Sequence, residues 1–304
     1  MRRRKIIYIF LVFAFILAFI FGAIIFYFQN NSGLKIVFLD VGQGDAILLT
    51  EGQNQVLIDG GPNRQKILEE LGKYIPFWDR QIEIVIATHP DADHIGGLVG
   101  VLGAYQVKTA IKTNAQNDTD VFGAFQKGLE VKKPARNVFG IADAGGAEII
   151  EAKKGVSVKF PSGAELNIVY PFAGVNSEKT SNSDTNAESV VAKLNFGENS
   201  FLFTGDLPSE KELEFIKGSE KIKANILKVA HHGSKYATTS EFLDIVKPED
   251  AIISVGKNNK YGHPTQEVLD RLKNIGAKIF RTDEMGDIVY ECKVQSSKCK
   301  VIFD

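Results

Sequence analysis

The sequence predicts a mixed α/β sandwich preceded by one membrane-spanning helix. An uncharged apolar run occupies residues 6–28, and behind it strand-like runs alternate with helical segments. Neighbouring strand-like runs are joined by short turns, which argues against a purely parallel sheet. The 304 residues are 44% hydrophobic and 24% charged, a composition that supports one large folded domain.

The apolar run is long enough to cross a bilayer, because at ~1.5 Å per residue it spans roughly 34 Å against a hydrocarbon core of ~30 Å. The basic stretch RRRK at 2–5 precedes it, so the positive-inside rule predicts a cytoplasmic N-terminus and an extracytoplasmic remainder. A cleaved signal peptide is the alternative, although its apolar region is normally only ~7–15 residues. We expect basic residues and an anchor at 1–28, a linker at 29–34 and one domain at 35–304.

The elements of the domain follow from periodicity and turn residues. Consecutive strands are expected within 34–61, with turns at 42–45 and 51–54, and further strands at 82–89, 156–160, 166–170, 189–206 (a hairpin), 225–230, 251–256, 287–294 and 298–304. Helices are expected at 62–79, 94–105, 119–130, 208–218, 238–247 and 265–276.

The two cysteines, Cys292 and Cys299, lie in the last two strand-like runs. A two-residue turn at Gln295-Ser296 would set them directly opposite each other, close enough for a cross-strand disulfide. An oxidising compartment would permit that bond, and two reduced strand cysteines are the alternative.

The predicted soluble part carries no excess of positive charge. Without the stretch 2–5, 32 Lys and Arg remain against 37 Asp and Glu, a net charge of about −5. This charge balance does not indicate strong nonspecific nucleic-acid binding by a basic face. Lys228, Lys235 and Lys257 are expected to be solvated surface lysines, with contact to an anionic substrate as the alternative.

The stretch THPDADHIGG, 88–97, places two histidines and two aspartates directly after the apolar run IEIVIA. All five histidines of the chain are expected in loops after strand-like runs or in Gly/Pro turns, which predicts one site at one edge of the sheets; they are His89, His94, His231, His232 and His263. Imidazole and carboxylate are ligands for divalent transition ions. The four polar residues of the stretch are too close in sequence to face one ion, so two ions are expected to share the loop. Asp206, at the end of FLFTGD, would bridge them.

The stretch HPDADH resembles the His-x-His-x-Asp-His motif of the metallo-β-lactamase fold superfamily, with Asp91 in place of the middle histidine. With VFLDVGQGDAILL, LIDGG, FTGD and LKVAHHGS, it resembles the extracellular metallo-hydrolase domain of the ComEC family of bacterial competence DNA-uptake proteins. The resemblance covers nearly all of the chain behind the apolar run. It implies a four-layer αββα sandwich.

The resemblance also implies the ligand set. His89 and Asp91 would bind the first ion, Asp93 and His94 the second, and Asp206 would bridge. The carboxylate of Asp91 makes Mn²⁺ or Fe candidates as well as Zn²⁺.

Some positions depart from the superfamily pattern or leave alternatives open. A further histidine ligand of the superfamily has no counterpart before Asp206, and Asn186 in DTNAESVVAKL is the best positional match. His231, His232 and His263 could each complete the second site. We favour His231 as the ligand, with His232 or His263 left to protonate a leaving group or to hold the substrate.

Two further aspartates, Asp45 and Asp59, are expected to steady the ligands through hydrogen bonds rather than to bind metal.

The expected activity is metal-assisted hydrolysis with two divalent ions, Zn²⁺ or Mn²⁺, in which a metal-bound hydroxide attacks and Asp93 orients or deprotonates the water. The ComEC resemblance favours DNA or another phosphodiester as substrate. The alternatives are a hydrolase of cell-envelope phosphoesters or of a small ester or lactone, and a non-catalytic metal-binding module.

Overall fold

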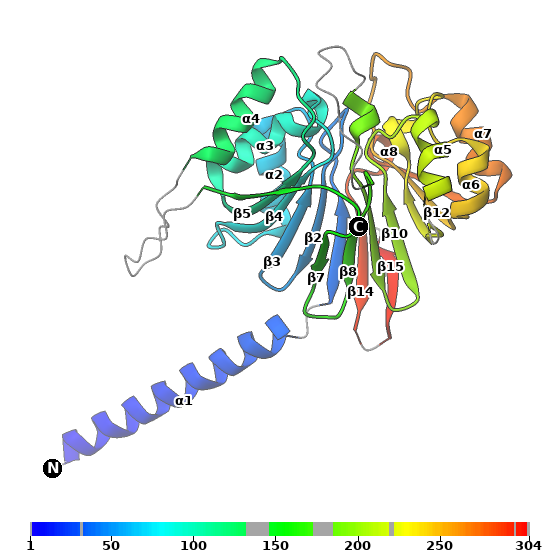
Figure 1. The fold of residues 1–304 in the computed structure, drawn as a ribbon. Helices are drawn as coiled ribbons and strands as arrows, with labels where there is room; N and C mark the ends of the chain where they lie inside the picture. The colour runs from blue at the N-terminus through cyan, green and yellow to red at the C-terminus, as the bar shows by residue number, and fades with distance from the viewer. Residues whose placement is uncertain are drawn as a thin grey trace.

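Two β-sheets face each other and helices cover their outer sides, as Figure 1 shows. The structure is a computed structural model that describes residues 2–30, 33–131, 146–172, 185–218, 222–294 and 296–302. The layer order confirms the four-layer αββα sandwich expected from the sequence. The linker expected at 29–34 and the turn at Gln295-Ser296 each include residues outside the described part.

The first sheet has eight strands in the order β15-β14-β1-β2-β3-β4-β5-β6. Their bounds are β1 (Leu34–Phe38), β2 (Ile47–Glu51), β3 (Asn54–Ile58), β4 (Gln81–Ala87), β5 (Gln106–Lys112), β6 (Glu148–Glu151), β14 (Ile288–Lys293) and β15 (Lys298–Ile302). Strands β3 to β6 are parallel, whereas β15, β14, β1, β2 and β3 pair antiparallel. Its outer face is covered by α2 (Arg64–Tyr74), α3 (Ala92–Ala104) and α4 (Asp120–Glu130).

The second sheet has seven strands in the order β13-β12-β11-β10-β9-β8-β7. Their bounds are β7 (Ser157–Lys159), β8 (Glu165–Tyr170), β9 (Val191–Phe196), β10 (Asn199–Phe203), β11 (Ile226–Lys228), β12 (Asp250–Ile253) and β13 (Lys278–Arg281). Helices α5 (Ser209–Gly218), α6 (Ser240–Val246) and α7 (Gln266–Asn274) lie on its outer face. Three short helical segments connect elements: η1 (Thr185–Glu188), η2 (Ala230–Gly233) and α8 (Thr282–Met285).

Alternation along the strands divides the apolar residues among three cores, one between the sheets and one under each helical layer. Phe38 packs against both Phe203 and Tyr290 in the central core. The Tyr290 hydroxyl donates to Asp250 Oδ2 at 2.8 Å, so the buried phenol ties the two sheets together. Burial of apolar side chains on both faces of each sheet thus fixes the register of the strands that lead to the site.

The C-terminal hairpin confirms the expected disulfide. Strands β14 and β15 pair antiparallel with Cys292 opposite Cys299, and the two sulfurs are bonded. Cys292 is buried in the central core, so the bond fastens the edge strand β15 to the rest of the sheet.

The N-terminal helix α1 (Arg2–Asn30) projects away from the sandwich in Figure 1. Its segment Lys5–Ala23 is long and apolar enough to cross a membrane, a property that signal sequences near an N-terminus share. Its described side chains are exposed to solvent, unlike those of a core helix.

Candidate metal centre

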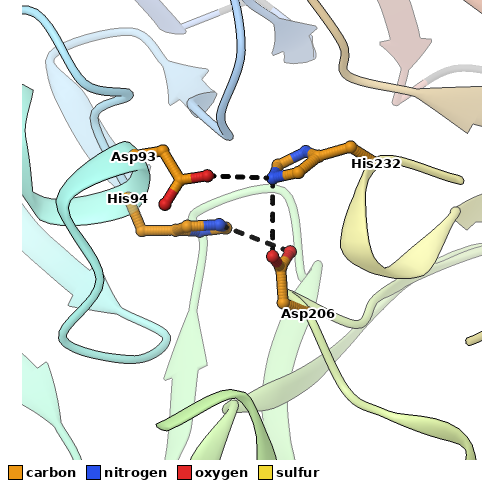
Figure 2. A group of neighbouring side chains, drawn as sticks. All are labelled: Asp93, His94, Asp206 and His232. Atoms are coloured by element: carbon orange, nitrogen blue, oxygen red, sulfur yellow. Dashed lines mark ion pairs between the residues drawn. The ribbon is translucent and has the colours of Figure 1, made fainter. Parts of the chain in front are cut away.

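Four side chains from three parts of the chain meet at one edge of the sandwich (Figure 2). Asp93 and His94 lie in the first turn of α3, Asp206 follows β10, and His232 lies in η2 after β11. His94 is therefore a helical residue, inside the helix expected at 94–105, and the expectation that every histidine lies in a loop was wrong for it. Because β4, β10 and β11 all run toward this edge, the residues that follow them converge there.

The four side chains, which we call the metal cluster (Asp93, His94, Asp206 and His232), are linked by three close contacts. His94 Nε2 lies 3.3 Å from Asp206 Oδ1, and His232 Nε2 lies 3.4 Å from Asp206 Oδ2. His232 Nε2 is also 3.4 Å from Asp93 Oδ2. Asp206 thus faces both histidines, as Figure 2 shows. Only the Asp93 side chain is appreciably exposed, at 33%, so the cluster opens to solvent on its side.

Asp59 fixes the ring of His94, as the sequence predicts for a supporting residue. Its Oδ2 lies 2.8 Å from His94 Nδ1, and Thr88 Oγ1 donates to the same oxygen at 2.6 Å. Its Oδ1 accepts from the Thr88 backbone N–H at 2.8 Å. Because the Asp59 carboxylate lies beside Nδ1, Nε2 of His94 points into the cluster. Carboxylates orient metal-binding histidines in this way in many metal sites.

Asp45 holds a similar position behind His232, and here the structure corrects the expectation for Lys228. Asp45 Oδ1 lies 3.3 Å from His232 Nδ1, while its Oδ2 forms an ion pair of 2.7 Å with Lys228 Nζ. Lys228 is fully buried rather than solvated, because it lies in β11 and also donates to the Val229 carbonyl at 2.9 Å. Gly44 lets this loop close on the cluster, since a Cβ there would meet the Asp93 carbonyl oxygen at 2.1 Å.

The sequence-based preference made His231 the metal ligand and left His232 outside, whereas the structure places His232 in the cluster and His231 at its margin. Both have left-handed backbone angles, with φ of 49° and 53°. His232 is buried within the cluster, and its Nδ1 lies 2.9 Å from the Ser254 carbonyl oxygen. His231 is partly exposed and its Nε2 lies 3.9 Å from Asp206 Oδ2. The geometry therefore gives the last inward-facing position to His232.

His89 and Asp91 form a second, less complete group next to the cluster. His89 is buried with its ring 4.0 Å from that of His94, and its Nε2 lies 3.8 Å from Asp91 Oδ2. Asp91 Oδ1 accepts hydrogen bonds from Asn117 Nδ2 at 3.2 Å and from Thr185 Oγ1 at 2.5 Å. Sequence reasoning missed both partners, because only the fold brings them beside the HPDADH stretch.

Asn186, the positional match for the absent histidine, lies in η1 with its backbone carbonyl accepting from the Ser189 N–H at 3.0 Å. The hydroxyl of Ser189 lies 3.5 Å from His89 Nδ1 and accepts from the Asp206 N–H at 3.1 Å. A neutral hydroxyl thus connects His89 with Asp206 on this side.

His263, the remaining candidate, stays outside the cluster. Its ring lies 5.7 Å from that of His231 and stacks on Tyr261 at 5.8 Å. His231 and His263 therefore line the margin of the site together.

The electrostatics of the cluster favour a cation. Burial opposes ionisation of Asp206, but the nearby charges of His232 and His94 hold its pKa well below the usual range. Burial likewise opposes charge on His232, yet Asp206, Asp45 and Asp93 raise its pKa to about 9. The carboxylates thus draw protons onto the histidines, and a divalent ion can replace those protons.

His89 differs from the other buried histidines. Burial, together with the neighbouring charge of His94, lowers its pKa to about 4, so its imidazole is neutral near pH 7. Neutral imidazole is the form that binds metal.

Unpartnered buried atoms show that the residues fit a metal. Among the buried side-chain atoms of the described residues that lack a hydrogen-bond partner, four belong to the cluster and to the neighbouring His89: His89 Nε2, His94 Nε2, Asp206 Oδ1 and His232 Nε2. Leaving such groups unsatisfied is costly, and a divalent ion satisfies several at once. The mixed nitrogen and oxygen donors suit Zn²⁺, Mn²⁺ or Fe.

The fold and this donor set are matched by a known family. The sequence model described as Metallo-beta-lactamase superfamily matches residues 39–257, which include every element of the cluster. The chain belongs to the metallo-β-lactamase superfamily. Among solved structures, the metallo-β-lactamase fold protein YhfI from Bacillus subtilis is similar, with a TM-score of 0.53 and 14% identity over 86% of this chain and 100% of that one.

Within the superfamily, the chain is similar to competence proteins. It is 33% identical over 276 residues to ComE operon protein 3 of Bacillus subtilis (strain 168), covering 85% of this chain and 33% of that protein. It is 26% identical to Competence protein ComA of Neisseria gonorrhoeae, covering 86% of this chain and 32% of that protein. The chain thus spans about a third of the length of these relatives, and the resemblance to ComEC-type hydrolase domains is confirmed.

Proposed function

We propose that this superfamily member is a membrane-anchored, extracytoplasmic, metal-dependent phosphodiesterase that acts on DNA. The observation that carries the proposal is the convergence of four buried, unsatisfied imidazole and carboxylate atoms at one open edge of the sandwich. Support for a DNA substrate comes from the names of two similar proteins, Competence protein ComA of Neisseria gonorrhoeae and Recombination protein 2 of Haemophilus influenzae.

In this proposal Asp93, His94, Asp206 and His232 would hold one divalent ion. His89 and Asp91, together with Asp206, would hold a second. Such ions make water more acidic and neutralise charge that develops on phosphate oxygens. The second group offers fewer protein ligands, so we expect it to bind its ion more weakly.

The protein residues around the ions have separate tasks. Asp93 is the most exposed member of the cluster, so it orients the attacking water on the solvent side. Asp59 and Asp45 hold the His94 and His232 rings through Nδ1. His231 and His263, at the margin, hold the phosphate or the leaving group.

Three features support the anchored, extracytoplasmic location. The segment Lys5–Ala23 meets the length and composition of a span, and basic residues precede it. The bonded Cys292–Cys299 pair fits an oxidising compartment outside the cytoplasm.

Hydrolysis of bis-p-nitrophenyl phosphate by the purified full chain, with Mn²⁺ or Zn²⁺, tests the activity. We expect metal-dependent turnover of this substrate, which Asp93→Ala abolishes. In a second assay we expect the same protein to cleave single- or double-stranded DNA. Asp244→Ala, which removes an exposed aspartate of α6 outside the cluster, serves as the matched control and should keep its turnover. Absence of turnover with either metal, in protein shown to be folded and metal-loaded, would contradict the phosphodiesterase assignment and leave a small ester or lactone substrate or a binding module.

A further inference from the structure

An exposed aromatic pair lies far from the metal cluster, in the turn between α2 and β4. Phe77 is 79% exposed and Trp78 is 69% exposed, and their rings contact edge to face at 4.9 Å. Large aromatic side chains that project together into solvent are unusual and mark interaction surfaces. The proposed hydrolysis does not use them.

The turn that carries the pair is held in place by polar contacts. The Asp79 N–H donates to the Pro76 carbonyl at 2.9 Å and closes the turn. Asp79 Oδ2 accepts from Gln55 Nε2 at 3.0 Å, and Oδ1 accepts from the Gln81 N–H at 3.1 Å. The aromatic rings are therefore presented on a fixed support, which limits the entropy lost on binding.

The turn lies at the edge of the first sheet opposite the metal cluster. Strand β1 is antiparallel to β2, β2 to β3, and β3 is parallel to β4, so β1 and β4 begin at the same edge. Helix α1 enters the domain at the start of β1, and the aromatic turn precedes the start of β4. With neighbouring strands ~4.8 Å apart, three spacings separate the two points by about 14 Å. The apolar helix and the exposed aromatics thus approach the same edge.

The β14–β15 hairpin adds positive charge at this edge. Its exposed Lys293 and Lys298 are paired directly across the two strands. Like charges in that position destabilise a hairpin unless an anion neutralises them. The chain leaving α1 passes against this hairpin, since a Cβ on Gly33 would meet the Cys292 carbonyl oxygen at 2.1 Å. The point where α1 enters therefore has aromatic residues on one side and a lysine pair on the other.

We propose that this edge, which we call the membrane edge (Phe77, Trp78, Lys293 and Lys298), rests on the bilayer in which α1 is anchored. Tryptophan and other aromatic residues favour the headgroup region, and lysines bind anionic lipid. The inference rests on the anchoring part of the proposed function but not on the hydrolysis. Docking would hold the metal cluster at the far edge of the sandwich, about 20 Å above the surface for a seven-residue strand such as β4. The site would then face away from the membrane, toward a polymer in the aqueous phase.

The chain's single tryptophan makes a direct test possible, because all tryptophan emission comes from Trp78. The full chain is reconstituted into vesicles that contain anionic lipid, and flotation first shows that it is membrane-bound. We expect blue-shifted emission that lipids brominated near the headgroup quench strongly and aqueous iodide quenches weakly. Charge reversal in the variant Lys293→Glu/Lys298→Glu should weaken the quenching by lipid.

A relocated probe is the matched control. In Trp78→Phe/Tyr236→Trp, the tryptophan replaces an exposed tyrosine on the loop that follows η2, at the metal-cluster edge. Its emission should be quenched by iodide and not by brominated lipid. If the protein floats with the vesicles but its Trp78 emission is quenched by iodide and not by brominated lipid, the docking is overturned and the anchor stands. Failure to float would overturn the anchor and the docking together, and neither result depends on catalytic activity.

Discussion

The buried ion pair between Asp45 and Lys228 makes a quantitative prediction about stability and metal binding. The Asp45 carboxylate and the Lys228 ammonium are 2.7 Å apart and both are buried. Burial opposes ionisation of Asp45, but Lys228 and His232 outweigh it and lower the pKa of the carboxyl. The perturbations are Asp45→Asn, Lys228→Met and the two combined.

The expected magnitudes follow from the burial of both partners. Removing one member of a buried pair leaves the other charge uncompensated and costs about 3–5 kcal/mol, whereas removing both often costs little. Each single variant should therefore lose about 3–5 kcal/mol of unfolding free energy, and the double variant should lose clearly less than their sum. Asp45→Asn also weakens the support of His232 Nδ1, so its metal affinity should fall by about 10–100-fold, while Lys228→Met keeps that contact.

Urea unfolding of chelator-treated protein, followed by circular dichroism, measures the free energy of unfolding of each variant without the contribution of bound metal. Calorimetric titration with Mn²⁺ or Zn²⁺ measures the affinity. Additive losses in the double variant, or single losses below about 1 kcal/mol as for a surface pair, would refute the reasoning.

Three further predictions concern other residues. Asp206→Ala should lose bound metal and hydrolytic activity together, and unchanged metal content by mass spectrometry would remove Asp206 from the site. Reducing the disulfide between Cys292 and Cys299, seven residues apart, should lower the free energy of unfolding by about 2–3 kcal/mol by the loop-entropy relation. Reductant should therefore lower the melting temperature of the parent and leave that of the Cys292→Ala/Cys299→Ala variant unchanged. Asp287 accepts from the Asp40 N–H, Tyr74 and Lys73, which outweigh burial and lower its pKa. A carboxyl whose pKa is lowered on folding stabilises the protein above the unfolded pKa of ~3.9, and this stabilisation is lost as the pH falls through the lower, folded pKa. Asp287→Asn should therefore be less stable than the parent at pH 7 and equally stable in acid below the folded pKa; a constant difference across pH would contradict this.

Local sequence patterns predicted most of the elements, because most strands and helices here agree with their intrinsic periodicity, but the strands β5, β6 and β13 were not among those expected. The buried run before THPDADHIGG became β4, and the polar stretch behind it opened α3. The helical start at Ala92, two residues before the expected start at 94, places His94 in the first turn, with Asp91 in extended conformation at the position before the helix. Helix boundaries of this kind depend on a few residues and are hard to locate from periodicity.

The choice between His231 and His232 lay beyond sequence reasoning for a physical reason. Both residues adopt left-handed backbone angles, which occur neither in a strand nor in a right-handed helix, so no strand or helix period tells which ring faces inward. Tertiary contacts decide it, with the Ser254 carbonyl and Asp45 holding the His232 ring.

Lys228 shows a related limit. A lysine beside a strand end is usually solvated, and only the packing of the loop containing Asp45 against β11 buries it. The partners of Asp91, Asn117 and Thr185, likewise come from distant segments that the fold brings together.

The most direct test of the metal cluster compares two adjacent histidines. After dialysis against Mn²⁺ or Zn²⁺ and removal of free ion, metal content per chain is measured for the parent, His232→Ala and His231→Ala, each shown to be folded by its melting transition. The structure predicts that His232→Ala loses bound metal while His231→Ala retains it. Loss in His231→Ala with retention in His232→Ala would contradict the assignment of the cluster.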